Sequence, residues 1–186
     1  MNGFFGKVPS LGDFVSRRLP AEFLHPWDAW LQAGLQCSRE RLVEQWLEVY
    51  LCSPIWHFAL TAGVCGELGW AGVMIPSVDR VGRYFPLTVA AAVGVISPLD
   101  TAWYGEVERL ALSALSEAFS LEAFDELLMA LPLPTQINES STRMDPAVRV
   151  LFWTDGSPRV APTMWEGERL PDAETFADML GGIDVR

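Results

Sequence analysis

The chain has 186 residues, which suits one domain and is long enough to bury a core without disulfide or metal staples. It carries 13 basic and 24 acidic residues, a net charge of −11, and this excess of acid excludes nucleic acid and anionic membranes as favoured partners. Half of its residues are apolar, so we predict one fully folded domain over residues 1–186.

The N-terminal residues show no basic stretch followed by an apolar run, so they do not resemble a signal peptide. The longest charge-free stretch, residues 84–99, contains prolines and falls short of the about 20 apolar residues that a membrane helix needs. Three cysteines are an odd number for a disulfide framework, and we expect them to be reduced thiols. We therefore expect a cytoplasmic protein that does not bind membranes.

Glycines and a proline interrupt the apolar residues 3–12, which predicts a short strand that runs into a loop. From Pro20, apolar residues recur at helical spacing as far as Leu35, with Pro26 tolerable in a first turn. Ser38 is predicted to cap a second helix. The apolar stripe of that helix consists of Leu42, Trp46, Val49 and Tyr50.

The middle of the chain changes to strand-like patterns. Residues 55–62 are rich in strand formers, residues 63–69 contain the glycines of a hairpin connection, and residues 70–75 form the partner strand. A third strand is predicted over residues 85–96. The connections are too short for parallel crossovers, so these strands are expected to be antiparallel.

Residues 97–100 begin a helix that is expected to continue to about Phe119, with Trp103, Leu110 and Leu115 largely buried against one face of the sheet. A further helix covers residues 121–131, and the polar residues 135–146 are predicted to be a surface loop.

At the C-terminal end, residues 148–153 and 159–164 flank a turn at 154–157, which predicts a hairpin. Asp172 caps a last short helix that ends before Gly181. The order of elements predicts the α+β class: a single domain with a mainly antiparallel sheet covered by helices.

Metal and cofactor chemistry find little support in the sequence. His25 and His57 are far apart, no two cysteines have zinc-ligand spacing, and Val8 follows Lys7 where a phosphate loop needs Ser or Thr. We expect no metal or cofactor, and we interpret His57 as a hydrogen-bonded, partly buried strand residue. Acidic residues crowd the two central helices and are expected to form a solvated face, or alternatively an acidic docking surface: Asp100, Glu106, Glu108, Glu117, Glu122, Asp125 and Glu126.

Two segments, residues 3–15 and 76–86, each combine glycines, a proline, an aspartate and cations in loops beside the sheet. Loops on a rigid scaffold are where binding residues tend to lie. We expect the two loops to meet, and Asp13–Arg17 and Asp79–Arg83 to form ion pairs that are exposed and contribute little to stability. The candidate partner-binding residues are Lys7, Ser10, Asp13, Phe14, Arg17, Asp79, Arg80, Arg83 and Tyr84. The competing interpretation is that these charged residues only hold the loops in place and do not bind a partner.

These segments also carry a resemblance to a known family. Residues 3–7 and 12–14 are similar to the opening signature of TagF, an accessory protein family of type VI secretion systems. Residues 53–56, 72–77 and 79–88 continue that resemblance in the same order. Together they span about the first half of the chain. Beyond Leu99 the resemblance rests on helix pattern and length.

The resemblance implies a post-translational repressor that acts by binding other proteins and not by catalysis. The family is linked to a threonine-phosphorylation pathway with a kinase, a phosphatase and a forkhead-associated scaffold protein. It implies type VI secretion proteins as partners, with that scaffold as one candidate. Some relatives are fused to a phosphatase domain, of which the sequence up to Arg186 shows no sign.

Two alternatives stay open. The chain could be a structural subunit of the secretion apparatus, which would expose a large apolar patch. It could instead be an enzyme that uses Lys7 and Asp13 of one loop and Asp79 and Arg83 of the other, with a deep pocket where they converge. The sequence does not set the oligomeric state.

Overall fold

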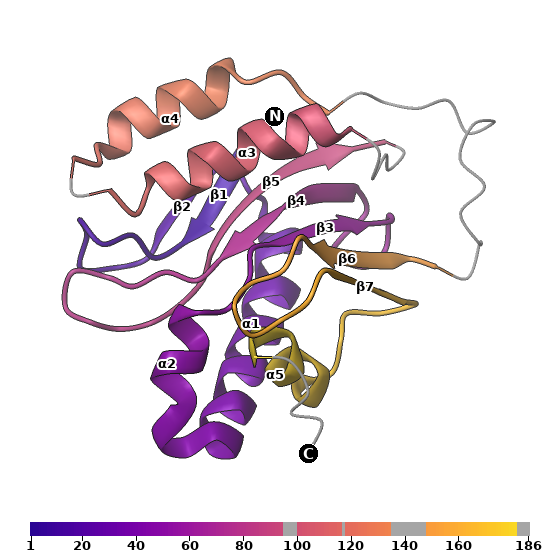
Figure 1. The fold of residues 1–186 in the computed structure, drawn as a ribbon. Coiled ribbons are helices and arrows are strands. Elements are labelled where there is room, and N and C mark those ends of the chain that lie inside the picture. Colours follow the sequence, from indigo (N-terminus) through magenta and orange to yellow (C-terminus); the bar gives the residue numbers. More distant parts are fainter. Residues whose placement is uncertain (95–99, 117, 135–147, 182–186) are drawn as a thin grey trace.

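The computed structural model describes residues 1–94, 100–116, 118–134 and 148–181 (Figure 1). Its centre is a seven-stranded sheet in the order β2-β1-β5-β4-β3-β6-β7, and every neighbouring pair is antiparallel. The strands are β1 (Asn2–Gly6), β2 (Val15–Arg17), β3 (Trp56–Leu60), β4 (Gly69–Ile75), β5 (Leu87–Val93), β6 (Val150–Thr154) and β7 (Thr163–Gly167). The predicted antiparallel meander β3-β4-β5 is confirmed.

Helices cover both faces of the sheet (Figure 1). On one face lie α1 (Ala21–Leu42), α2 (Trp46–Leu51) and α5 (Ala173–Gly181), with a single 3-10 turn, η1 (Val43–Gln45), between the first two. On the other face lie α3 (Thr101–Ser113) and α4 (Leu121–Ala130). The predicted α+β class, a single domain with its antiparallel sheet covered by helices, is confirmed. None of the described helices is both long and apolar enough to cross a membrane.

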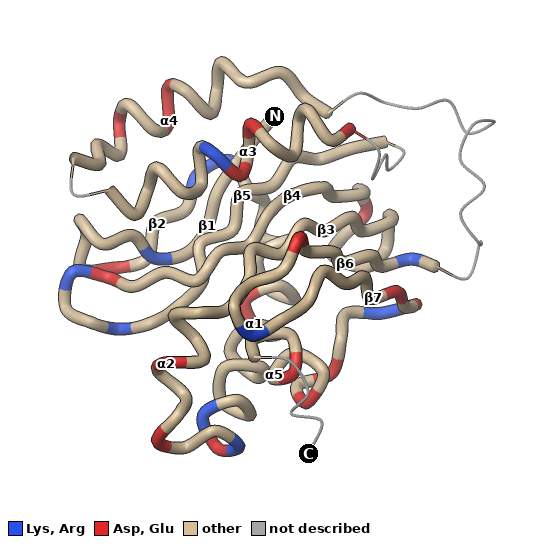
Figure 2. The backbone as a smooth tube through the Cα atoms, viewed as in Figure 1, with Lys and Arg blue, Asp and Glu red and all other residues tan. Residues whose placement is uncertain are grey.

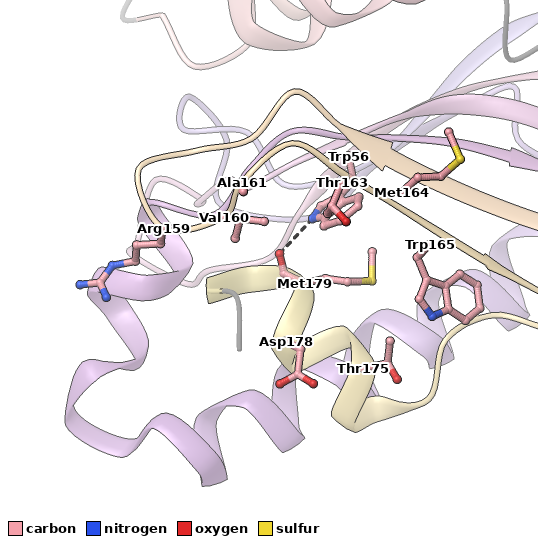
Figure 3. A pocket seen from close by; sticks show the side chains of 10 residues that line it. All are labelled: Trp56, Arg159, Val160, Ala161, Thr163, Met164, Trp165, Thr175, Asp178 and Met179. Atoms are coloured by element: carbon pink, nitrogen blue, oxygen red, sulfur yellow. Dashed lines mark hydrogen bonds between the residues drawn. The ribbon is translucent and has the colours of Figure 1, made fainter. Parts of the chain in front are cut away.

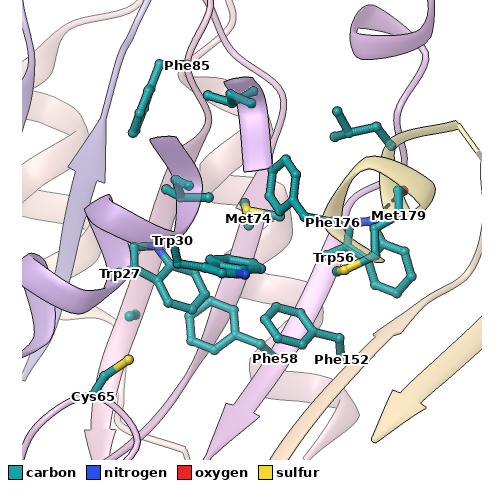
Figure 4. Packing of buried hydrophobic residues seen from close by; sticks show 14 of the residues in the cluster. Trp27, Trp30, Trp56, Phe58, Cys65, Met74, Phe85, Phe152, Phe176 and Met179 are labelled. Carbon is teal, nitrogen blue, oxygen red and sulfur yellow. Dashed lines mark hydrogen bonds between the residues drawn. The ribbon is translucent and has the colours of Figure 1, made fainter. Parts of the chain in front are cut away.

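Aromatic rings fill the α1 face of the sheet (Figure 4). Because side chains alternate along a strand, every second residue of β3 points to this face, and Trp56 and Phe58 are fully buried there. Trp27 of α1 packs against Phe58 with ring centroids 4.5 Å apart, and its indole N–H donates to the Thr88 hydroxyl at 2.9 Å. The ring pairs and this hydrogen bond fix how α1 lies on the sheet.

The α3 face is packed mainly with aliphatic side chains. Val107 and Leu110 of α3 are buried against Val73 and Val89 of the sheet. Leu110 is 3% exposed and Trp103 is 5% exposed, as predicted. Leu115 is 38% exposed, so the prediction that it is buried is wrong. The helix ends at Ser113, before the expected end near Phe119, and Leu115 lies in the turn beyond it.

The predicted break at Ser38 is also wrong. Ser38 lies inside α1, fully buried, and its hydroxyl donates to the Leu35 carbonyl and accepts from the Trp46 indole N–H, both at 2.8 Å. The chain turns instead at Val43, whose φ of +44° breaks the helix. Pro26 lies in the second turn of α1, one turn later than expected.

Other predictions hold with shifted limits. Asp172 accepts a hydrogen bond from the Thr175 amide, as the predicted helix cap. Asp100, in the segment predicted to begin a helix, accepts one from the Trp103 amide. The C-terminal hairpin forms, but its second strand is Thr163–Gly167 and not residues 159–164, because the connection between the strands is longer than four residues. The predicted surface loop over residues 135–146 lies outside the described residues.

Candidate functional site

The two loops singled out in the sequence meet at one end of the sheet. The first loop (residues 7–14) follows β1, and the second loop (residues 76–86) joins β4 to β5, the strand that pairs with β1. Lys7 Nζ lies 3.0 Å from Asp79 Oδ2, and the Arg80 amide donates to the Leu11 carbonyl at 2.8 Å. The prediction that the loops meet is confirmed. We call this junction the two-loop site.

Asp79 is the centre of the two-loop site. Its Oδ1 accepts from the amides of Val81 and Arg83 at 3.0 and 2.9 Å, and its Oδ2 accepts from Arg83 Nε at 2.7 Å. Burial alone would raise the pKa of the Asp79 carboxyl, but the hydrogen bonds from the Arg83 amide, Lys7, the Arg83 guanidinium and the Val81 amide hold that pKa well below its usual range. The predicted Asp79–Arg83 ion pair is confirmed.

Further hydrogen bonds tie the second loop to the rest of the fold. The Ser77 hydroxyl donates to the Lys7 carbonyl at 2.7 Å. The Tyr50 hydroxyl donates to the Ser77 carbonyl at 2.9 Å and accepts from the Ser77 amide at 3.0 Å. Burial raises the pKa of Tyr50, so its hydroxyl keeps its proton. Gly6 has a φ of +141° and lies against the Pro86 carbonyl, which brings the two loops close. These contacts hold the backbone of the second loop against the first loop and against Tyr50 of α2.

Apolar and cationic side chains form the exposed part of the site. Phe14 is 44% exposed, stacks on Phe5 at 5.6 Å, and lies under the Lys7 ammonium at 4.9 Å. Val81 is 64% exposed. The exposed Arg80 has no ion pair among the described residues. Figure 2 shows charged residues of both signs gathered in these loops. The surface offered to a partner is thus apolar and partly cationic.

The structure corrects two expectations about the charges of the site. The Asp79–Arg83 ion pair was expected to be exposed, but Asp79 is 3% exposed and also pairs with Lys7, which is 5% exposed. Asp13 forms no ion pair with Arg17 in the described part of the chain. Its carboxylate accepts from the Phe14 amide at 2.8 Å, while the Arg17 guanidinium donates to the Ser16 carbonyl.

The remaining candidates lie at the margins of the site. Ser10 is exposed in the first loop, and Tyr84 is half-buried, with its ring edge against the rings of Trp46 and Tyr50. Sequence reasoning missed Val81 and Tyr50. Val81 could have been found as an apolar residue between two arginines in a glycine-containing loop. Tyr50 could not, because its role depends on a segment 27 residues away.

An open hollow of about 430 Å³ adjoins the second loop on its α1 side. It is lined by Leu35, Gln36 and Arg39 of α1 and by Tyr84 and Phe85 of the loop. Lys7 and Asp79 do not line it, so the hollow and the charged centre of the site are separate.

The acidic residues of α3 and α4 have individual roles. The His57 ring lies 2.8 Å from Glu108, so His57 is the hydrogen-bonded strand residue that we predicted. Asp125 pairs with Arg18 at 2.5 Å. These two carboxylates are therefore engaged within the fold, and the expectation of a uniformly solvated face holds only in part. Among the described residues, no three His, Cys, Asp or Glu side chains are grouped as a metal site would need.

Comparisons with known proteins agree with the resemblance seen in the sequence. The family model of the TagF N-terminal domain, described as type VI secretion system-associated, matches residues 3–131 and so includes both loops. The crystal structure of PA0076 from Pseudomonas aeruginosa PAO1 superimposes with a TM-score of 0.87 at 36% identity, covering 100% of this chain and 96% of that one. The comparison with curated proteins found no match.

Proposed function

The chain belongs to the TagF family of type VI secretion-associated proteins, and on that basis we propose that it is a post-translational repressor of a type VI secretion system. It represses by binding other proteins of that system in the cytoplasm and not by catalysis. The forkhead-associated scaffold protein implied by the sequence resemblance is the first candidate partner. The binding surface that we propose is the two-loop site.

The observation that carries this proposal is the exposure of Phe14, Val81 and Arg80 on loops held by buried bonds. Aromatic and arginine side chains contribute much of the affinity of protein interfaces. Loops that are already ordered lose little entropy on binding. Lys7 and Arg83 share the single carboxylate of Asp79, and Arg80 is exposed without an ion pair among the described residues, so in a chain of net charge −11 this site favours an acidic segment of the partner.

The ionisation of the site favours a binding role over the enzyme alternative. A general base works best when its pKa lies near the operating pH. The pKa of Asp79 is held well below its usual range, so its carboxylate is a weak base at neutral pH. Lys7 and Arg83 both lie within 3.0 Å of that carboxylate. The ion pairs of Asp79 with Lys7 and Arg83 therefore suit the role of holding the loops that carry a binding surface.

The test compares Arg80→Glu with Arg109→Glu, which reverses the charge of an exposed arginine on α3, away from the loops. Both variants replace the native copy, and secretion is measured in cells while binding to the purified scaffold protein is measured in solution. We expect Arg80→Glu to release secretion and to lower affinity at least ~30-fold, since a charge desolvated in a complex costs ~2–5 kcal/mol when lost.

Arg109→Glu is expected to repress like the wild type, and both variants should keep its melting temperature. Full repression by Arg80→Glu would place the binding surface elsewhere. If deletion of the native copy leaves secretion unchanged, the repressor role itself is wrong. Repression without scaffold binding would point to a different partner.

A further inference from the structure

Strand β7 forms an open edge of the sheet. It pairs with β6 and with no other described strand, and Met164 is 58% exposed. In an antiparallel strand, the amides and carbonyls of alternate residues point to opposite sides, so the outer side of β7 presents backbone groups that no described residue pairs with. Exposed edges are commonly blocked by lysine, proline or a covering segment. Within β7 neither lysine nor proline occurs, and Glu166 is its one charged residue.

A groove of about 610 Å³ lies beside β7 (Figure 3). The chain before β7 and helix α5 form its other walls, and Trp56, Val160 and Met179 contribute apolar side chains. The indole N–H of Trp56 already donates to the Met179 carbonyl at 3.0 Å. The two charged lining residues, Arg159 and Asp178, already pair with Glu48 and Arg41. The groove therefore suits an apolar side chain.

We propose that β7 binds an extended, basic segment of another protein as an added eighth strand, with an apolar side chain of that segment in the groove. Side chains of a strand alternate between faces. Thr163 and Trp165 line the groove on the α5 face, and alternation places Glu166 on the opposite face. An added strand would therefore place apolar residues toward α5 and its alternate residues beside Glu166.

Charge indicates that the segment is basic. Glu166, Glu168 and Glu174 are exposed and form no ion pair in the described part of the chain. Opposite charges that face each other across neighbouring strands stabilise the pair, and like charges destabilise it. The β7 strand of a second copy of this chain would bring no cation to face Glu166, so a different, basic protein is the better match.

This surface is separate from the two-loop site. The two-loop site lies at β1 and β5, and β7 is the edge strand at the far end of the strand order. The inference therefore does not rest on the proposed repressor function.

The test uses the full chain and a synthetic twelve-residue peptide in which lysine alternates with phenylalanine or valine, at concentrations where the free peptide is monomeric. Backbone NMR of the labelled protein reports where the peptide binds and which amides exchange more slowly. We expect shifts in residues 163–167 and at least a ten-fold slowing of amide exchange there. Two comparison peptides have the same residues in blocks, or glutamate in place of lysine, and should bind more weakly.

Two variants probe the contacts separately. Glu166→Lys should weaken binding about two- to five-fold, the effect of one cross-strand charge pair. Thr175→Trp fills the groove and should weaken binding at least ten-fold. Glu126→Lys, which alters an exposed acid on α4, is the matched control and should leave affinity unchanged.

Several results would overturn the inference. The first is that the block peptide or the glutamate peptide binds as tightly as the alternating lysine peptide. The second is that the NMR shifts are confined to elements other than β7. The third is that Glu166→Lys leaves the affinity for the alternating lysine peptide unchanged. Sedimentation of the wild type as a dimer that Glu166→Lys alters would identify a second copy as the occupant and refute the basic partner. If Thr175→Trp fails to fold, the affinity measured for Glu166→Lys still decides the test.

Discussion

At the two-loop site, burial decides what each charge does. Lys7 and Asp79 are 5% and 3% exposed and hold two loops together that are about 70 residues apart in sequence. Arg80 and Phe14 belong to the same loops but reach solvent, where they can contact a partner. The candidate residues therefore divide into a buried structural pair, Lys7 and Asp79, and an exposed pair, Arg80 and Phe14. Substitutions in the first pair should lower stability, and substitutions in the second should lower partner binding.

Asp79 is expected to make stability depend on pH on the acid side. Its pKa is lower in the folded protein than its ordinary value of 3.8, so its ionised form stabilises the fold. That contribution is fully present above about pH 4 and is lost as the pH falls through the lower, folded pKa. Denaturant unfolding measured from about pH 6 to about pH 2 should show a smaller loss of stability in Asp79→Asn than in the wild type.

The control for Asp79 is Asp13→Asn, which changes an exposed carboxylate in the neighbouring loop. We expect it to retain the acid-side slope of the wild type. Equal slopes in the wild type and Asp79→Asn would show that Asp79 is no better stabilised in the folded chain than in the unfolded one.

At the scale of elements, the ends of α3 decide which side chains are buried. Leu110 lies inside the helix and faces the sheet, whereas Leu115 lies beyond its last turn. The two leucines are five residues apart, yet their exposed fractions are 3% and 38%. The same substitution at both positions therefore compares the stability contributed by a leucine packed against the sheet with that of an exposed one.

Leu110→Ala is expected to lower the free energy of unfolding by about 2–5 kcal/mol, because it removes buried methyl groups and leaves a cavity. Leu115→Ala should lower it by less than about 1 kcal/mol. Urea unfolding of both variants measures the difference. Similar losses in both would mean that Leu115 packs as tightly as Leu110 in solution.

Two glycines should respond oppositely to alanine. Gly105 lies in the middle of α3 with open space where a methyl group would stand, so Gly105→Ala should stabilise the protein by about 0.4–1 kcal/mol. At Gly6 a methyl carbon would lie 2.1 Å from the Pro86 carbonyl oxygen. Gly6→Ala should therefore destabilise the protein by more than about 1 kcal/mol. Thermal melts of both variants check the signs, and a neutral Gly6→Ala would contradict the close approach of the loops.

At the scale of the whole molecule, the C-terminal part completes the fold that the family match begins. Strand β6 pairs with β3, and Phe176 of α5 packs against Gly34 of α1. The Trp30 indole N–H donates to the Pro171 carbonyl at 2.8 Å. The aromatic core on the α1 face thus includes residues beyond 131, the last residue that the family model matches.

A chain that ends after Pro134 is therefore expected not to fold on its own. It would expose the edge of β3 and the part of the aromatic core that Phe152 and Phe176 cover. Such open edges and apolar faces favour aggregation. Size-exclusion chromatography and thermal melts of the truncated chain test this. A monomer that unfolds cooperatively would mean that residues 1–134 form a core sufficient for folding.

The sequence by itself determined the features that depend on near neighbours. Residues 55–62 have the composition and period of a strand, glycines mark the turn to β4, and Asp172 caps the last helix. Each of these depends on backbone geometry within a few residues. The two-loop site could be anticipated as well, because its loops flank strands that were predicted to share one sheet.

Only the tertiary structure decided which of these residues are buried. The Ser38 hydroxyl bonds to Leu35 and Trp46 inside the helix bundle, so a residue type that favours helix caps lies mid-helix. Asp79 closes a tight turn onto Arg83, whereas Asp13 lies in a bend before β2 and Arg17 lies at the far end of that extended strand, so the two side chains do not pair. Burial of Lys7 against Asp79 needs two loops folded together, and such contacts depend on the whole sheet and not on local sequence.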